Sequence, residues 1–176
     1  MKPRKMDTHY RILALEIRPR RLGYAAFEPP AKFVAFGVTR FHSLQTGIRR
    51  ATSWMDGLRP TILVLRKIER RSTRDRRRTR LLVHLIRLSA RHSSIRVSLV
   101  SKRQLQAHFR TYALTTKYQV ASFLAGTFPE LASRLPGSRK PWERENWHMP
   151  VFDATAIAVT YLAKTDEATL QKLTRG

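Results

Sequence analysis

The sequence predicts an α/β protein built on a mixed five-stranded sheet with helices on both faces. Three apolar or aromatic runs follow one another near the N-terminus, and two further apolar runs each come after a helical pattern. Successive strands with short connections form an antiparallel meander, whereas strands that alternate with helices pair in parallel. With 176 residues, of which 42% are hydrophobic, the chain can bury the core of one domain.

The first strand is predicted at "YRILALEI", where side chains alternate with a period of two. This alternation places Glu16 on the same face as Ile12 and Ala14, and apolar side chains alone on the other face. "RLGYAAFE" and "KFVAFGVTRF" are the second and third strands, separated only by "PPA". The meander therefore sets a glutamate inside its first strand, directly before a cluster of arginines.

A helix is predicted over residues 43–58, with apolar side chains at Leu44, Ile48, Ala51 and Met55. It ends before the dipeptide "RP", because a residue that precedes proline disfavours helical geometry. The next run, "TILVL", is apolar throughout, which is typical of a strand buried on both faces.

The next helix is predicted to begin at Ser72, because "STRD" has the spacing of a capping box with Asp75 as its acid. Its first half is almost entirely charged, and we expect its apolar face to consist of Leu81, Leu85 and Leu88. "IRVSLV" then forms the fifth strand.

Two further capping boxes, "SKRQ" and "TKYQ", predict two short helices. Residues 128–149 are rich in proline and tryptophan and predict a loop with one helical turn at "PELASRL". "PVFDATAIAVTYLAK" is apolar nearly all round and predicts a buried helix that Pro150 opens. The single domain is flanked by a basic N-terminal arm at 1–9 and a C-terminal tail at 165–176.

The composition points to a polyanionic partner. Lys and Arg number 35 against 12 Asp and Glu, a formal charge of +23, and such an excess favours a ligand whose counterions are released on binding. Membrane binding is disfavoured, because no segment is mainly an amphipathic helix and no apolar run is long enough to span a bilayer. We expect a cytoplasmic, nucleoid-associated protein that binds DNA or RNA.

The basic side chains are unusually unmixed with acids, since no acidic residue occurs between Arg76 and Pro129. Arginines also recur at three- and four-residue spacing at the start of the second helix, as one helical face requires. No motif for reading bases in a groove is present, so we expect contacts with the phosphate backbone. The predicted nucleic-acid-binding residues are Arg18, Arg20, Arg21, Arg66, Lys67, Arg70, Arg71, Arg74, Arg77, Arg78, Lys102, Arg103 and Lys117.

Two motifs resemble the RuvC-type Holliday-junction resolvases, which have an RNase H-like fold. "ILALEIRPRRLGY" is similar to the first strand and turn of that family, "ILGIDPG…TGY", and "DATAIAVTY" to its last helix, "DALAIAITH". "PTILVL" and "TTKYQV" match its fourth strand and a lysine-containing helix start, so the resemblance covers residues 11–164. It implies binding of DNA junctions and phosphodiester hydrolysis by two Mg²⁺ or Mn²⁺ ions, and it raises the question of a homodimer.

The resemblance also implies where metal-binding carboxylates should stand. The first family aspartate falls on Glu16 and the last on Asp153, whereas the family glutamate after the fourth strand falls on Arg66 and a fourth ligand on Pro150. Two of the four positions therefore lack the negative charge that two metal ions need. Glu69 could supply it only if a bulge or helix start re-aims its side chain.

Each of these residues also has a structural interpretation. Glu16 can simply be neutralised by Arg18, Arg66 or Lys67, and Asp153 stands in the first turn of a helix, where an acid is favourable in any protein. The histidines lack metal-ligand spacing, and His148 is a weak candidate for a base. Two tryptophans of the proline-rich loop, at 142 and 147, either stack on unpaired bases or pin the loop to the core.

Three functions remain open. The first is a RuvC-like protein that binds structured or branched nucleic acid through a basic surface, with a degenerate catalytic site. The second is a Mg²⁺-dependent endonuclease that uses Glu16, Asp153 and a re-aimed Glu69, with Glu16 and Asp153 as metal ligands. The third is a basic structural RNA-binding protein of a larger complex, for which the charge alone would suffice.

Overall fold

A computed structural model describes the backbone of residues 10–29, 32–68, 74–138, 140 and 142–174, and within these ranges the side chains other than those of 74–76 and 167–174. Several predicted sites lie outside it. These are the N-terminal arm at 1–9, Glu69, Arg70, Arg71 and the helix cap at Ser72, together with the side chains of Arg74 and Asp75.

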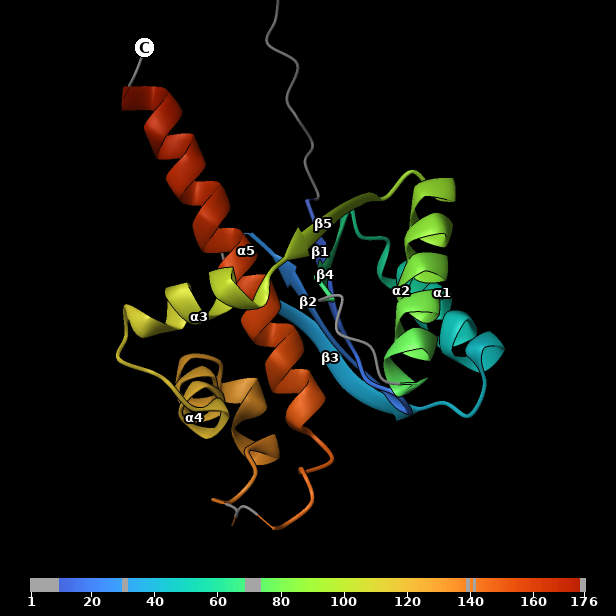
Figure 1. The fold of residues 1–176 in the computed structure, drawn as a ribbon. Helices are drawn as coiled ribbons and strands as arrows, with labels where there is room; N and C mark the ends of the chain where they lie inside the picture. Colours follow the sequence, from blue (N-terminus) through green and yellow to red (C-terminus); the bar gives the residue numbers. More distant parts are fainter. Residues whose placement is uncertain (1–9, 30–31, 69–73, 139, 141, 175–176) are drawn as a thin grey trace, which may run out of the picture.

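The five-stranded sheet has the order β3-β2-β1-β4-β5 (Figure 1). Its strands are β1 (Ile12–Ile17), β2 (Arg21–Glu28), β3 (Lys32–Arg40), β4 (Ile62–Arg66) and β5 (Arg96–Val100). The first three form an antiparallel meander, and β4 and β5 extend it in parallel from β1, which confirms the predicted mixed sheet. The ends of β1, β3, β4 and β5 and the start of β2 therefore lie at one edge, here called the site edge.

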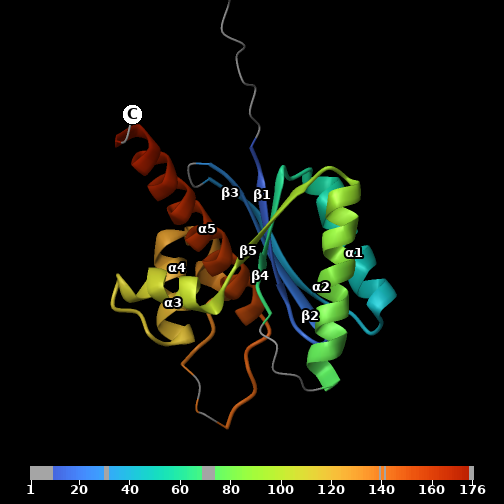
Figure 2. The ribbon, with the colours of Figure 1, turned by 45° about the horizontal axis from the view of Figure 1, so that its top comes forward.

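Helices cover both faces of the sheet, as predicted (Figures 1 and 2). On one face lie α1 (Leu44–Leu58) and α2 (Arg74–His92). The other face carries α5 (Met149–Thr174), with α3 (Lys102–Arg110) and α4 (Lys117–Thr127) packed against it. The predicted helical turn in the proline-rich loop is a 3₁₀ helix, η1 (Pro129–Arg134).

The alternation in β1 divides the core into two layers. Ile12 and Ala14 pack toward the α5 face, while Leu13, Leu15 and Ile17 pack toward α1 and α2. All six residues of β1 are buried, so its one charged member is buried with them. The period of two thus places the carboxylate of this strand on the face that α5 covers.

Helix starts follow their caps closely. Ser43, Ser101 and Thr116 each accept from the backbone amide three residues on, and each receives the reciprocal bond from that residue's side chain. The two boxes predicted before α3 and α4 are therefore confirmed. They make Lys102 and Lys117 the first residues of their helices.

The predicted apolar face of α2 is wrong. Leu81 and Leu88 are 46% and 47% exposed, whereas Leu82, Ile86 and Ala90 are fully buried. Two apolar stripes run side by side on this helix, one residue apart, and periodicity alone cannot choose between them. The second stripe packs on the sheet.

Helix α5 is longer than predicted, because it continues through Thr174 where a separate tail was expected from residue 165. The added segment, "TDEATLQKLT", consists largely of good helix formers. Pro150 stands in the first turn, as expected. None of the helices in the described ranges is apolar over a length that could cross a bilayer.

Candidate functional site

The buried glutamate lies at the end of β1, in the middle of the sheet. Glu16 is opposite Gly23 of β2, and on its other side β4 runs parallel, with Leu15 beside Leu65 and the strand ending at Arg66. Parallel strands bring their carboxyl ends to the same edge. An acid and an arginine from distant parts of the sequence thus meet at the site edge.

Two guanidinium groups approach the Glu16 carboxylate. Arg66 Nη2 lies 2.8 Å from its Oε1, and Arg18 Nε lies 3.1 Å from the same oxygen. Glu16 is 0% exposed, and within the described part of the chain neither of its oxygens has a hydrogen bond of good geometry. Ion pairs therefore balance this charge, as the sequence had suggested for Arg18 and Arg66.

Asp153 enters the same cluster from the first turns of α5. Its Oδ2 accepts a hydrogen bond from Arg18 Nη2, and Lys117 Nζ lies 3.6 Å from the same atom. The helix can come so close because Gly23 has no side chain: a Cβ there would lie 2.4 Å from the carbonyl carbon of Pro150. A glycine on β2 thus positions the acid on α5.

A third carboxylate, Glu145, completes the cluster, and sequence reasoning missed it. Arg18 Nη1 donates to its Oε2 at 2.7 Å, Lys117 Nζ donates to its Oε1 at 3.1 Å, and Arg21 Nη2 lies 3.3 Å from Oε2. The one feature of the sequence that could have pointed to Glu145 is the rarity of acidic residues in this chain. Nothing local in "PWEREN" places the side chain across 127 residues of sequence from Arg18.

Arg18 is the centre of this arrangement. Its Nε faces Glu16, its Nη1 faces Glu145 and its Nη2 faces Asp153, so one guanidinium joins all three carboxylates. A guanidinium presents several donors in a fixed plane, which suits it to bind several carboxylates at once. We call Glu16, Glu145, Asp153 and Arg18 the carboxylate cluster.

The environment shifts the pKa values of the cluster in opposite directions. Burial raises the pKa of Glu16 from 4.5 to about 7, although Arg66 opposes this rise. The pKa of Glu145 is lowered, because Arg18 and Lys117 outweigh its partial burial. The pKa of Arg18 is raised, since Asp153 and the other acids outweigh the desolvation of its guanidinium.

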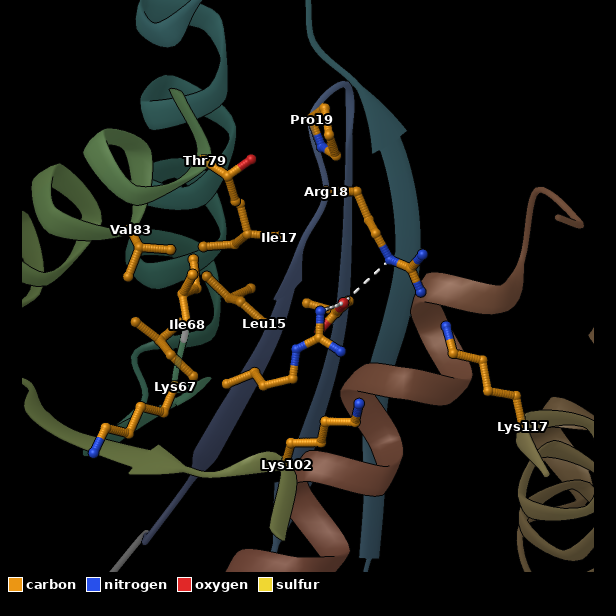
Figure 3. A pocket seen from close by; sticks show the side chains of 13 residues that line it. Leu15, Ile17, Arg18, Pro19, Lys67, Ile68, Thr79, Val83, Lys102 and Lys117 are labelled. Atoms are coloured by element: carbon orange, nitrogen blue, oxygen red, sulfur yellow. Dashed lines mark ion pairs between the residues drawn. The ribbon is translucent and has the colours of Figure 1, made fainter. Parts of the chain in front are cut away.

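A cleft of about 500 Å³ opens beside the cluster, between α2 and the first residues of α3 and α4. Figure 3 shows Arg18, Lys102 and Lys117 pointing toward one another on one side of it, and Lys67 pointing away from them. The opposite side is apolar, formed by Leu15, Ile17, Ile68 and Val83. The cleft therefore has one cationic and one apolar wall.

The remaining predicted contacts fall elsewhere. Arg20 and Arg21 line a second hollow, while Arg103 is exposed outside both. Arg77 and Arg78 are exposed on the first turns of α2. Of the predicted cations, the cleft brings together Arg18, Arg66, Lys67, Lys102 and Lys117.

His148 is a poor candidate for a base in this cleft. It does not line the cleft, and its pKa is lowered by partial burial and by the nearby charge of Arg134.

Comparison with known proteins gives structural neighbours only. No family model and no curated sequence matches the chain. The structure of Thermus thermophilus RuvC in complex with a Holliday junction matches 92% of this chain and 98% of its own, with a TM-score of 0.68 and 16% identity. The chain has the RuvC-type fold.

Two further structures share this RuvC-type fold. The yeast mitochondrial Holliday junction resolvase Ydc2 matches 87% of this chain and 78% of its own, with a TM-score of 0.63 and 13% identity. The fowlpox virus Holliday junction resolvase matches 88% and 99%, with a TM-score of 0.57 and 11% identity. They agree with the RNase H-like fold expected from the two end motifs.

The residues at the centre of this RuvC-type fold do not fit divalent metal ions. No group of three His, Cys, Asp or Glu side chains is arranged as a metal site among the residues that the structure describes. Each carboxylate of the cluster is instead paired with at least one cation, and Arg66 stands at the end of β4 where the resemblance implies a metal-binding glutamate. Guanidinium groups are therefore paired with the carboxylates whose negative charge metal ions would need.

Proposed function

We propose that this protein binds branched or otherwise structured nucleic acid through its phosphate backbone, and that its carboxylate cluster holds guanidinium groups in place of metal ions. One observation carries the proposal: Arg18 contacts all three carboxylates. The cluster is then a structural element of a binding surface. Cleavage by two metal ions would require the same carboxylates to be free.

The charge balance of the cleft supports binding of a polyanion. The carboxylates of the cluster are already paired with Arg18, Arg21, Arg66 and Lys117. Lys67 and Lys102 are exposed on the cleft wall, and among the described residues no ion pair is found for either. Their charges remain available for phosphates, which Lys and Arg bind through charge-assisted hydrogen bonds.

Two helix starts strengthen the positive potential of the cleft. Lys102 and Lys117 are the first residues of α3 and α4, and neither helix has an acid in its first turn. The N-terminus of a helix carries a partial positive charge, which acids usually accompany and which lysines here reinforce. This arrangement favours an anion in the cleft.

The structural neighbours favour a branched nucleic acid as the ligand. The Thermus thermophilus RuvC and fowlpox virus resolvase structures were each determined with Holliday junction DNA. Their likeness to this chain is one of fold, so the ligand is inferred from the shared architecture together with the cationic cleft.

The proposal is tested by the affinity for a four-way DNA junction, measured by fluorescence anisotropy over a range of salt concentrations. Replacing Lys67 and Lys102 by Gln should weaken binding and lower the log-log salt slope by about 2, since each phosphate contact contributes about 0.9. The matched control replaces Arg103 and Arg110 on the exposed side of α3, away from the cleft. Loss of affinity in the control alone would show that the binding surface lies outside the cleft. Tighter binding of RNA than of the DNA junction would favour the structural RNA-binding alternative.

A further inference from the structure

A second hollow, of about 560 Å³, lies beside the cleft at the site edge. It is built by the β1–β2 turn, the end of β3 and the loop before α5, and it shares no lining residue with the cleft. We call it the arginine hollow, because half of its lining residues are arginines. The lining consists of Arg20, Arg21, Arg40, Phe41, His42, Arg144, Glu145 and Trp147.

Two of the charged side chains form the wall between the hollow and the cleft. Arg21 pairs with Glu145 and also donates to the backbone oxygen of Asn146 at 3.1 Å. Glu145 pairs in turn with Arg18, which lines the cleft. The series of ion pairs from Arg18 through Glu145 to Arg21 thus separates two cationic depressions. The charges of these three side chains are already paired with one another.

Three other arginines of the hollow remain available. Arg20, Arg40 and Arg144 have exposed side chains, and no carboxylate pairs with any of them in the part of the chain that the structure describes. Among the described residues, the one acid that lines the hollow is Glu145, whose charge is already neutralised by Arg18, Arg21 and Lys117. Three of the four guanidinium groups of the hollow therefore have no carboxylate partner among the described residues.

The tryptophan of the hollow identifies the part of a nucleic acid that fits. The guanidinium of Arg40 lies 4.7 Å from the ring centroid of Trp147, and that of Arg21 lies 5.8 Å from it. These cation–π contacts occupy the ring and hold Arg40 at the rim. Trp147 therefore secures the loop and its arginines, and the hollow presents cations for phosphates in place of a stacking surface for a base.

We propose that the arginine hollow binds the phosphate backbone of a second nucleic-acid strand while a first strand lies in the cleft. This second-strand site rests on the proposed function and adds a reason why the protein should prefer branched nucleic acid to a linear duplex. The ion-paired wall divides the two depressions, so they suit two backbones that diverge, as at a branch point. Planar guanidinium forks bind phosphates in two-point contacts, and two linked contacts raise affinity well above that of one.

The test compares two variants that each lose two cations. In the hollow variant Arg20 and Arg144 are replaced by Gln, which leaves the Arg40–Trp147 contact intact; in the cleft variant Lys67 and Lys102 are replaced by Gln. Affinities for a four-way junction and for a linear duplex of the same arm sequence are measured by anisotropy. We expect the hollow variant to lose about tenfold or more in junction affinity and far less in duplex affinity, and the cleft variant to lose affinity for both.

Equal losses for junction and duplex in the hollow variant, or no loss for the junction, would overturn the second-strand site while leaving the cleft intact. Failure of the unaltered protein to bind either ligand would overturn the proposed function and this inference together. A second readout is tryptophan emission: junction binding should change it in the unaltered protein and in Trp142→Phe, but not in Trp147→Phe. If junction binding changes the emission of Trp147→Phe as much as that of the unaltered protein, the bound strand lies away from the hollow.

Discussion

The guanidinium of Arg66 lies 2.8 Å from the carboxylate of Glu16, at the neighbouring ends of two parallel strands. Glu16 is the only charged residue of β1, and it is fully buried on the face covered by α5. In the resemblance to RuvC-type resolvases, both positions carry acids. Two carboxylates at these positions would repel each other unless metal ions lay between them. The Glu16–Arg66 pair instead attracts directly.

Replacing Arg66 by Gln should destabilise the fold, because among the described residues it leaves the buried charge of Glu16 with Arg18 as its only ion-pair partner. Breaking a fully buried pair costs about 3–5 kcal/mol, but Arg66 is 38% exposed, so a loss of about 1–2 kcal/mol is expected. Urea unfolding at pH 8 measures it. Lys67→Gln, which removes the next cation along the chain, should change the stability by less, and equal losses would mean that the pair has no special role.

The raised pKa of Glu16 predicts a dependence of stability on pH. Between about pH 4.5 and pH 7 the folded state keeps a proton that the unfolded state has released, so this group stabilises the fold at low pH. That contribution is lost as the pH rises through about 7. Arg66, Arg18, Lys117 and Asp153 are the charged groups that act on it.

The check is the difference in unfolding free energy between Glu16→Gln and the unaltered protein from pH 5 to pH 8. As the pH rises, the stability of the variant should increase relative to that of the unaltered protein, because Gln carries no charge to bury. Glu28→Gln is the control: the pKa of Glu28 is lowered, chiefly by its bond from Arg11, so this carboxylate stays ionised over the whole range. A constant difference for Glu16→Gln would show that Glu16 titrates normally.

Gly23 should tolerate no side chain. An added Cβ would lie 2.4 Å from the backbone of Pro150, which must move, and with it the first turn of α5 and Asp153. We expect Gly23→Ala to cost about 1–3 kcal/mol on thermal or urea unfolding and to weaken junction binding. In Gly126→Ala on α4 the added Cβ meets no described atom within 4 Å beyond its chain neighbours and its own helix backbone, so this variant should be neutral or stabilising. Similar behaviour of the two variants would mean that α5 does not depend on this close approach.

Removing the guanidinium groups of Arg18 and Arg66 should convert the cluster into a metal site. With Arg18→Gln and Arg66→Glu together, Glu16, Asp153 and Glu145 lose their principal cations and gain a fourth carboxylate at the end of β4. Excess Mn²⁺ should then raise the melting temperature of the variant, since a ligand that binds the folded state stabilises it. It should leave the unaltered protein and Arg20→Gln/Arg66→Glu largely unaffected. A comparable rise in the unaltered protein would show that its arginines do not exclude metal ions.

Local signals predicted much of the fold. The period of two in β1 placed Glu16 in the core, and the boxes at Ser101 and Thr116 placed two lysines at helix starts. Local signals failed where two solutions fit equally well. The apolar stripe through Leu81 and Leu88 is as regular as the buried one, and only packing against the sheet distinguishes them.

The site could be predicted only in part, for a different reason. The resemblance indicated Glu16, Asp153 and Arg66 as parts of one site, and the structure brings them together through Arg18 and Glu16, because their strands and helix are regular elements. Glu145 stands in an irregular loop, so no periodicity or cap indicates where its side chain points. Likewise the turn after β1 sends Arg18 into the cleft and Arg20 into the arginine hollow, although they are two residues apart.

Incubation of the protein with an end-labelled four-way DNA junction and Mg²⁺ or Mn²⁺ shows whether the carboxylate cluster binds without cleaving. Binding is confirmed on a native gel, products are resolved on a denaturing gel, and Asp153→Asn is run beside the unaltered protein. We expect a junction that is retarded on the native gel and remains intact with both proteins. Metal-dependent cleavage that disappears in Asp153→Asn would contradict this expectation, because the carboxylate cluster would then be a working active site.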